Sequence, residues 1–333
     1  MEKPSRIYGF VRSRQMEGSY NNDPSIGVWP ITACRVARAC GNIEESQWPY
    51  PKEGDWPPIE PPDVDRLAKA NRISVYQRVK NIEECKEVIY RYGAVNIAVD
   101  ITSAWRSAPR GRIQMPTPNE PIEGSHSFAV FAYDDAIKRF EFVNSWGVNW
   151  GDKGFGSLPY EYFERYFQEA WLMFRPSIKP ERVARFGGNV FTWEQETSLH
   201  KVIHGIEITE VRTDERIGWA FAVEYDGVLN VEEFFIMPLN RRKGWAKILL
   251  QEVMELSDYL KIPLKFWISH ADAKNENMRV IYKLARRIDF VVSDTDVCWA
   301  SFEATKRKYP DWYYREGDVN LPLVGHELKV TRY

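Results

Sequence analysis

The residues best suited to chemistry lie in one stretch, residues 124–156. His126 heads an apolar segment, Ser127–Tyr133, and Asn144 directly follows a second one, Arg139–Val143. Two strands joined by a short turn would bring the histidine beside the asparagine. A histidine oriented by an asparagine can take the proton of a cysteine thiol, so this pair supplies two parts of a Cys-His-Asn catalytic apparatus. The alternative interpretation is a hydrogen bond that only supports the fold.

The elements before this stretch are typical of a mixed α and β domain. A helix is predicted over residues 27–40, and a second one begins at Asn81, where Glu84 stands three residues on as in a capping box. Gly93 is expected to end that helix. Between the helices, the Pro-rich residues 48–62 are expected to be irregular. The other predictions are a half-buried strand over residues 95–101, a long loop over 102–121, and a strand over 170–174.

The run after the histidine carries a more specific signal. It reads NSWGVNWGDKGF over residues 144–155, and the histidine lies in GSHS, residues 124–127. With weaker similarity at Glu45–Tyr50, these motifs make residues 5–175 resemble the papain-like cysteine peptidases. The resemblance implies an α+β papain-like fold, with His126 as base and Asn144 as its orienter. It also implies a peptide or protein ligand for this domain.

No catalytic cysteine is found at the spacing that the papain-like resemblance implies. In the family this cysteine lies roughly 130–150 residues before the histidine and asparagine. Counting back from His126 and Asn144 reaches the region of Met1 or beyond. Cys34 and Cys85 lie on the apolar faces of predicted helices and are interpreted as buried core residues. Two explanations stay open: a non-catalytic domain that has lost its nucleophile, or a nucleophile segment encoded upstream of Met1.

A second constellation lies in residues 231–250, VEEFFIMPLNRRKGWAKILL. A strand ends near Pro238, a basic turn with one glycine follows, and an amphipathic helix runs to about Tyr259. Backbone N–H groups at such a turn form an anion site. The order from Glu232 to Ala246 resembles the GNAT superfamily of acyl-CoA N-acyltransferases over residues 188–305. An ordinary solvated turn is the alternative.

The GNAT resemblance implies an α/β fold, acetyl-CoA or another acyl-CoA as co-substrate, and an amine acceptor that the sequence does not identify. It implies that Tyr282 protonates the leaving thiolate, although the glycine that usually follows in the family is missing here. Glu232 or Glu233 is the candidate base, and the sequence does not show which of them faces the site. The implied cofactor-binding residues are Ile236, Met237, Arg241, Arg242, Lys243, Gly244, Trp245, Ala246, Lys247 and Asn275.

Composition sets the remaining expectations. The 333 residues are 44% hydrophobic and 28% charged, with a net charge of −2, so no general attraction to nucleic acid or to anionic membranes is expected. No segment reaches the roughly 20 apolar residues of a membrane helix, and no signal peptide is recognised. The four cysteines lack zinc or disulfide spacing, which favours a cytoplasmic protein without a metal.

The predicted organisation is a papain-like domain over residues 1–175, a linker over 176–188 and a GNAT domain over 189–333. The leading function is acyl-CoA-dependent N-acyltransfer with a papain-like domain that binds peptide. The alternative is a papain-like cysteine endopeptidase whose nucleophile segment is missing from this chain, with an accessory GNAT domain. A third interpretation makes both domains non-enzymatic binding modules.

Overall fold

The structure is a computed structural model. Contacts between residues divide the chain into two compact units. The structure describes residues 3–20, 25–52, 55–174, 182–186, 189–198, 201–210, 212–262, 264–267, 290–294, 314–316, 319–321 and 327–332. Unit 1 joins Met1–Ser74 to Pro176–Tyr333, and unit 2 is Val75–Arg175. These units follow contacts, whereas the predicted domain boundaries follow sequence resemblance and stay a prediction.

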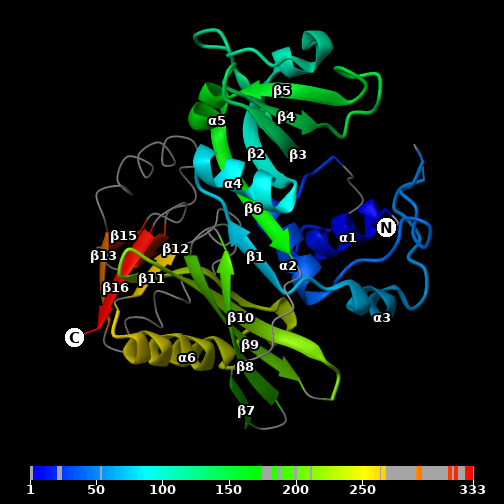
Figure 1. The fold of residues 1–333 in the computed structure, drawn as a ribbon. Coiled ribbons are helices and arrows are strands. Elements are labelled where there is room, and N and C mark those ends of the chain that lie inside the picture. The colour runs from blue at the N-terminus through cyan, green and yellow to red at the C-terminus, as the bar shows by residue number, and fades with distance from the viewer. Residues whose placement is uncertain are drawn as a thin grey trace. The chain divides into compact units, whose positions relative to one another are not determined.

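Unit 2 is built on a six-stranded sheet in the order β1-β6-β2-β3-β4-β5, with every neighbouring pair antiparallel (Figure 1). Its strands are β1 Val75–Arg78, β2 Val95–Thr102, β3 Ile122–Asp134, β4 Arg139–Val143, β5 Phe155–Pro159 and β6 Phe167–Phe174. Its helices are α4 Ile82–Tyr92 and α5 Tyr160–Tyr166, with the short 3₁₀ turns η2 Ser103–Trp105 and η3 Pro109–Gly111. The predicted strands over 95–101 and 139–143 are therefore confirmed.

Helix α4 shows how local sequence sets the boundaries in unit 2. The Asn81 side chain accepts the backbone N–H of Glu84 at 2.9 Å, which caps the first turn. The Glu84 carboxylate completes the cap one residue earlier than in a standard capping box, because it accepts from the backbone N–H of Lys80. Gly93 ends the helix with φ 89°, a left-handed conformation that glycine adopts without strain.

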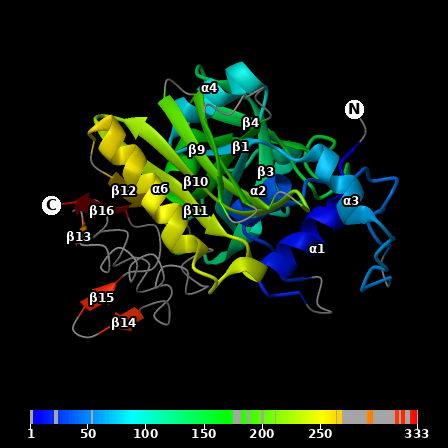
Figure 2. The same ribbon diagram turned by 90° about the horizontal axis from the view of Figure 1, so that it is seen from below.

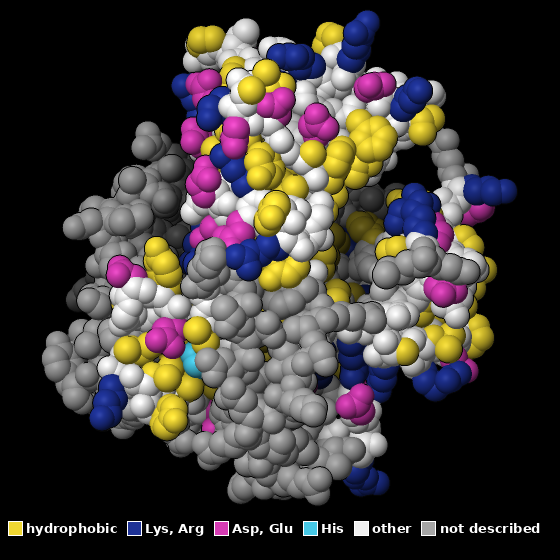
Figure 3. All heavy atoms as spheres, in the orientation of Figure 1, with side chains coloured by type: hydrophobic (Ala, Val, Ile, Leu, Met, Phe, Trp, Pro, Cys, Tyr) yellow, Lys and Arg dark blue, Asp and Glu magenta, His cyan; other side chains and the backbone are white. Residues whose placement is uncertain are grey.

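The strands β3 to β5 leave some large apolar side chains in contact with solvent. Phe131, Val143 and Phe155 are exposed, and the rings of Phe131 and Phe155 meet edge to face at 5.7 Å. Hydrophobic side chains lie among charged ones over this part of the surface (Figure 3). The buried side of the same strands carries Phe128, Phe140 and Phe142, so alternation along the strands separates the two faces.

Unit 1 contains an eight-stranded sheet in the order β13-β16-β12-β11-β10-β9-β8-β7 and a separate pair, β14-β15. Its strands are β7 Arg182–Phe186, β8 Asn189–Ser198, β9 Lys201–Glu210, β10 Glu215–Tyr225, β11 Val228–Ile236, β12 Leu264–Trp267, β13 Phe290–Asp294, β14 Tyr314–Glu316, β15 Val319–Leu321 and β16 Glu327–Arg332. Its helices are α1 Arg6–Met16, α2 Pro30–Ala39, α3 Val64–Ala68 and α6 Trp245–Leu260, with 3₁₀ turns η1 Lys69–Asn71 and η4 Pro238–Asn240. Strand β7 lies inside the predicted linker, where it pairs with β8.

One connection in this sheet differs from the others. Strands β11 and β12 are parallel, and α6 connects them. Helix α6 lies across β9, β10 and β11 (Figure 2) and buries Leu249, Leu250 and Val253 against Ile206, Ala220 and Val231. The turn Asp226-Gly227 joins β10 to β11, and both of its residues have positive φ values, as is typical of a tight hairpin turn.

Helix α2 carries buried arginines that pair with carboxylates of the same unit's sheet. Arg38 lies 2.5 Å from the carboxylate of Glu207 on β9, and Arg216 lies 2.9 Å from it. Burial alone would raise the pKa of Glu207, but the guanidinium groups of Arg38 and Arg216 hold that pKa below its ordinary value. Arg35 reaches Glu233 on β11 at 2.8 Å. Residues 1–74 are thus connected to the sheet by buried ion pairs.

Candidate functional site

The structure brings His126 and Asn144 together in unit 2, as the spacing predicts. His126 lies on β3, and Asn144 directly follows β4, its antiparallel neighbour. The Nε2 atom of His126 lies 2.8 Å from the Oδ1 atom of Asn144. Oδ1 also accepts the backbone N–H of Ser145 at 2.7 Å, which identifies that atom as the oxygen.

These contacts define the protonation of the imidazole ring. An amide oxygen accepts but does not donate, so Nε2 of His126 carries the hydrogen in the neutral ring. The other nitrogen, Nδ1, then has a lone pair available to take a proton. Burial lowers the pKa of His126, and the hydrogen bond to Asn144 opposes that shift. The neutral, proton-accepting form of the ring is therefore favoured.

Aromatic side chains enclose the pair. The rings of Trp146 and Trp105 lie 4.8 Å and 6.1 Å from the ring of His126. Trp150 donates from Nε1 to the backbone oxygen of Trp105, and Trp105 donates from Nε1 to the hydroxyl of Tyr162, at 2.8 Å and 2.9 Å. Trp105 is fully buried although it comes from the long predicted loop. Sequence reasoning missed it, and its one signal was a large apolar residue within a polar segment.

The described cysteines have the environment of core residues. Cys34, Cys40 and Cys85 are not in disulfides, and Cys34 and Cys85 are buried. Burial raises the pKa of the Cys40 thiol to about 11 and that of Cys85 further still. A thiol with a raised pKa is a poor nucleophile at neutral pH, so neither Cys40 nor Cys85 suits the role of the catalytic nucleophile. Cys298 lies outside the described residues.

The second predicted site forms a continuous turn in unit 1. Ile236 ends β11, Met237 precedes η4, and Gly244 stands at the N-terminus of the 16-residue helix α6. The Nε atom of Arg241 donates to the backbone oxygen of Ile236 at 3.1 Å. Gly244 has φ 88°, and the helix starts without a hydrogen bond from a capping side chain. Arg242 and Lys243 lie in the turn, while Trp245 and Ala246 pack against the core below α6, and Lys247 belongs to its first turn.

The structure assigns different surroundings to the two candidate carboxylates. Glu233 pairs with Phe221 and Val231 pairs with Ala222, so Glu232 lies where the register between β10 and β11 shifts. Oε1 of Glu233 accepts hydrogen bonds from Nε and Nη2 of Arg35 at 3.0 Å and 2.8 Å. This pairing argues against Glu233 as a general base, because a base needs its lone pair for the acceptor amine.

The other predicted residues of this site stay untested. Glu232 is buried in β11, and its role remains a prediction. Asn275 and Tyr282 lie outside the described residues. Among the part of the chain that the structure describes, no group of three His, Cys, Asp or Glu side chains is arranged to hold a metal ion. Nor does any described helix have the length and apolar character to cross a membrane.

Comparison with known proteins classifies one part of the chain. Residues 17–164 match the family model of the papain family cysteine proteases and form a papain-like cysteine peptidase domain of the α+β class. An uncharacterized peptidase C1-like protein of Acanthamoeba polyphaga mimivirus is 25% identical over 183 residues, 51% of this chain. The chain spans 58% of the length of that relative.

Two solved structures of cysteine proteases are also similar to part of this chain. Xylellain, a cysteine protease from Xylella fastidiosa, is 26% identical, with a TM-score of 0.48 over 53% of this chain and 71% of its own. Digestive procathepsin L 3 of Tenebrio molitor is 19% identical, with a TM-score of 0.40 over 52% of this chain and 56% of its own. Both scores are below 0.5, so the classification rests on the family match. That match ends at residue 164 and does not extend to the predicted GNAT domain.

Proposed function

We propose that the papain-like domain belongs to a cysteine peptidase in which His126 is the general base and Asn144 orients its ring. The observation that supports this proposal is the 2.8 Å contact between Nε2 of His126 and Oδ1 of Asn144, which leaves Nδ1 of His126 as the proton acceptor. This function replaces acyl transfer as the leading one, because the family match supports peptidase chemistry.

The mechanism follows from the tautomer of the ring. Nδ1 of His126 takes the proton of a cysteine thiol, and the thiolate attacks the carbonyl carbon of the peptide bond. The imidazolium then gives that proton to the leaving amine, and water releases the acyl group from the sulfur. Asn144 keeps the ring in place through both transfers. The thiol has to come from a cysteine other than Cys34, which is buried, and other than Cys40 and Cys85, whose pKa values are raised.

The test combines peptide hydrolysis with identification of the reacting thiol. The chain is incubated with a fluorogenic peptide and, separately, with a thiol-alkylating peptide epoxide, and the labelled cysteine is located by mass spectrometry. We expect hydrolysis and labelling of one cysteine, both lost in His126→Ala. Asn144→Ala should lower kcat more than KM, since it leaves the binding surface intact. Hydrolysis that persists in His126→Ala would refute the proposal.

A second candidate function is acyl-CoA-dependent N-acyltransfer in unit 1. It is supported by the parallel pair β11 and β12 with α6 between them, and by the basic turn that starts α6. Backbone N–H groups at that helix start, together with Arg242 and Lys243, would hold the pyrophosphate of acetyl-CoA. Trp245 and Ala246 would support the turn from the core side.

Gly244→Glu tests the acyl-CoA site directly. An added Cβ at Gly244 meets no atom within 4 Å, so the substitution places a carboxylate at the anion site without a steric clash. The positive φ adds backbone strain, and Gly244→Ala serves as the control for it. Calorimetry should show acetyl-CoA binding by the wild type and by Gly244→Ala, and its loss in Gly244→Glu. Equal binding by both variants, or none by the wild type, would refute this candidate.

A further inference from the structure

An open cavity of about 500 Å³ lies beside the candidate catalytic pair in unit 2. Its lining residues come from the long loop after β2 and from the glycine-rich run after β4: Arg106, Ser107, Ala108, Trp146, Asn149, Trp150 and Gly151. Trp146 is shared with the catalytic pair, since its ring lies 4.8 Å from that of His126. A group bound in the cavity therefore lies one side chain away from the imidazole.

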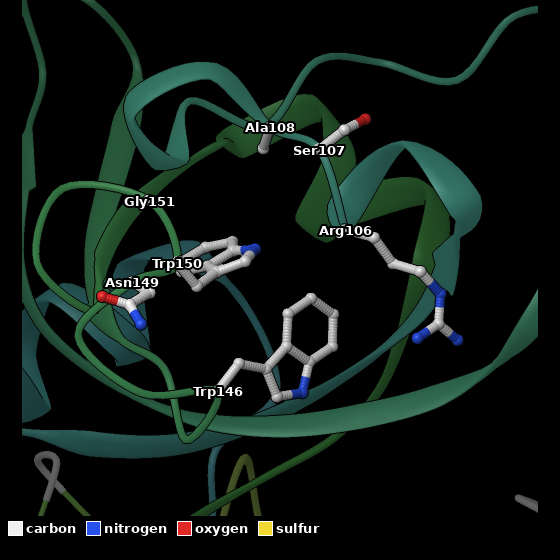
Figure 4. Close-up of a pocket in the computed structure, with 7 residues that line it drawn as sticks. All are labelled: Arg106, Ser107, Ala108, Trp146, Asn149, Trp150 and Gly151. Carbon is white, nitrogen blue, oxygen red and sulfur yellow. The ribbon is translucent and has the colours of Figure 1, made fainter.

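The cavity has an apolar centre and one charged flank. The indole rings of Trp146 and Trp150 meet edge to face at 5.6 Å in its middle. The Arg106 side chain extends along one flank, and Asn149 stands on the opposite one (Figure 4). Arg106 is the charged residue among those that line it. Such a lining suits a peptide segment that places apolar atoms on the indoles and a negative group beside the guanidinium.

Glu123 already orients this guanidinium. Nε and Nη2 of Arg106 donate to one oxygen of Glu123 at 3.2 Å and 3.1 Å. Glu123 lies on β3, three residues before His126, so the ion pair ties the loop to the strand of the catalytic base. Nη1 of Arg106 makes no hydrogen bond to the described residues and can donate to a ligand. Glu123 thus positions the guanidinium and also competes for its charge.

We propose that this cavity binds a carboxylate-bearing part of the peptide substrate and that Arg106 selects for it. The proposal rests on the peptidase function proposed above and adds a substrate class to it. The carboxylate is either the side chain of an acidic residue or the free C-terminus of the peptide. Both sources present the same planar group, which a guanidinium recognises with paired N–H donors.

The test measures binding of peptides that resist hydrolysis because an uncharged hydroxyethylene group replaces the scissile amide. The full chain is titrated calorimetrically with a neutral, C-terminally amidated parent peptide. Further peptides differ from the parent by one glutamate, placed at each position in turn, or by a free C-terminal carboxylate. We expect one of these peptides to bind about fivefold tighter than the parent at low salt, and this advantage to shrink at high ionic strength. The peptide that gains affinity identifies the source of the carboxylate.

Two variants of the ion pair separate ligand recognition from support of the loop. Arg106→Gln should abolish the advantage of the acidic peptide, whereas Glu123→Gln should increase it about two- to threefold by removing the competing carboxylate. If the pair only held the loop, both variants would weaken all peptides alike. Arg165→Gln is the matched control, because Arg165 is also exposed and ion-paired to a glutamate.

The outcomes distinguish this proposal from the peptidase function itself. Equal binding of acidic and neutral peptides, an advantage that survives Arg106→Gln, or no peptide binding at all would overturn the role of Arg106. A preference for carboxylates that depends on Arg106, in a chain that hydrolyses no peptide, would overturn the peptidase function and leave the binding proposal standing.

Discussion

Arg35→Met should be among the most destabilising single substitutions in unit 1. The side chains of Arg35 and Glu233 are 3% and 2% exposed, and the guanidinium donates twice to one carboxylate oxygen. Removing the arginine leaves a carboxylate buried without its main partner. Breaking a buried ion pair in this way costs about 3–5 kcal/mol. With a urea dependence of about 2 kcal/mol per molar, the midpoint of unfolding should fall by about 2 M.

The assay is urea unfolding followed by circular dichroism, with hydrogen exchange of peptides from β9 to β11 to assign the loss to unit 1. Arg66→Met is the matched control, since Arg66 pairs with Asp63 in the same unit at 70% and 68% exposure. That exposed pair should contribute less than about 1 kcal/mol. Arg35→Met with Glu233→Met should recover much of the loss, because it removes both buried charges. A loss in Arg35→Met no larger than in Arg66→Met would refute this account.

Three further predictions concern unit 2 and the thiols. Burial lowers the pKa of His126, so the unfolded chain binds more protons than the folded chain near pH 6. The free energy of unfolding should therefore fall from pH 7 to pH 5 more steeply in the wild type than in His126→Gln. Parallel pH profiles of the two proteins would contradict this prediction. Cys85, whose pKa is raised by burial, should react with iodoacetamide at pH 7.5 far more slowly in the native chain than in urea, as mass spectrometry can follow. Gly151→Ala should lower the free energy of unfolding by more than about 1 kcal/mol beyond Gly147→Ala. Both glycines have positive φ, but of the two only Gly151 would place an added Cβ 2.4 Å from a backbone oxygen, that of Phe155. Equal thermal stability of the two variants would contradict the predicted clash.

Local patterns in the sequence predict the elements that hold the candidate site. Alternating apolar residues, the cap at Asn81 and the stop at Gly93 define β2, β4 and α4 closely. The contact between His126 and Asn144 follows from them, because the end of β4 lies beside the earlier part of its antiparallel neighbour β3. These interactions are short in sequence, so residue types and spacing are enough to find them.

The long-range contacts were beyond such reasoning. Arg35 and Arg38 on a short helix are typical of a solvated helix face, yet their carboxylate partners lie 198 and 169 residues away on two strands of the sheet. No local periodicity in the sequence indicates that residues so far apart form an ion pair. The same limit applies to Glu232 and Glu233, because the register shift in β11 changes the alternation that a regular strand would give.

The geometry of His126 and Asn144 agrees with the general-base role proposed for the histidine. A histidine that acts as a general base needs one ring nitrogen with a lone pair available for the incoming proton. In this structure Nε2 of His126 is held by Asn144, and Asn144 is held in turn by the backbone N–H of Ser145. Nδ1 makes no hydrogen bond to the described residues, and the lowered pKa keeps its lone pair unprotonated near neutral pH. One nitrogen fixed and the other left to accept a proton is the arrangement that a general base requires.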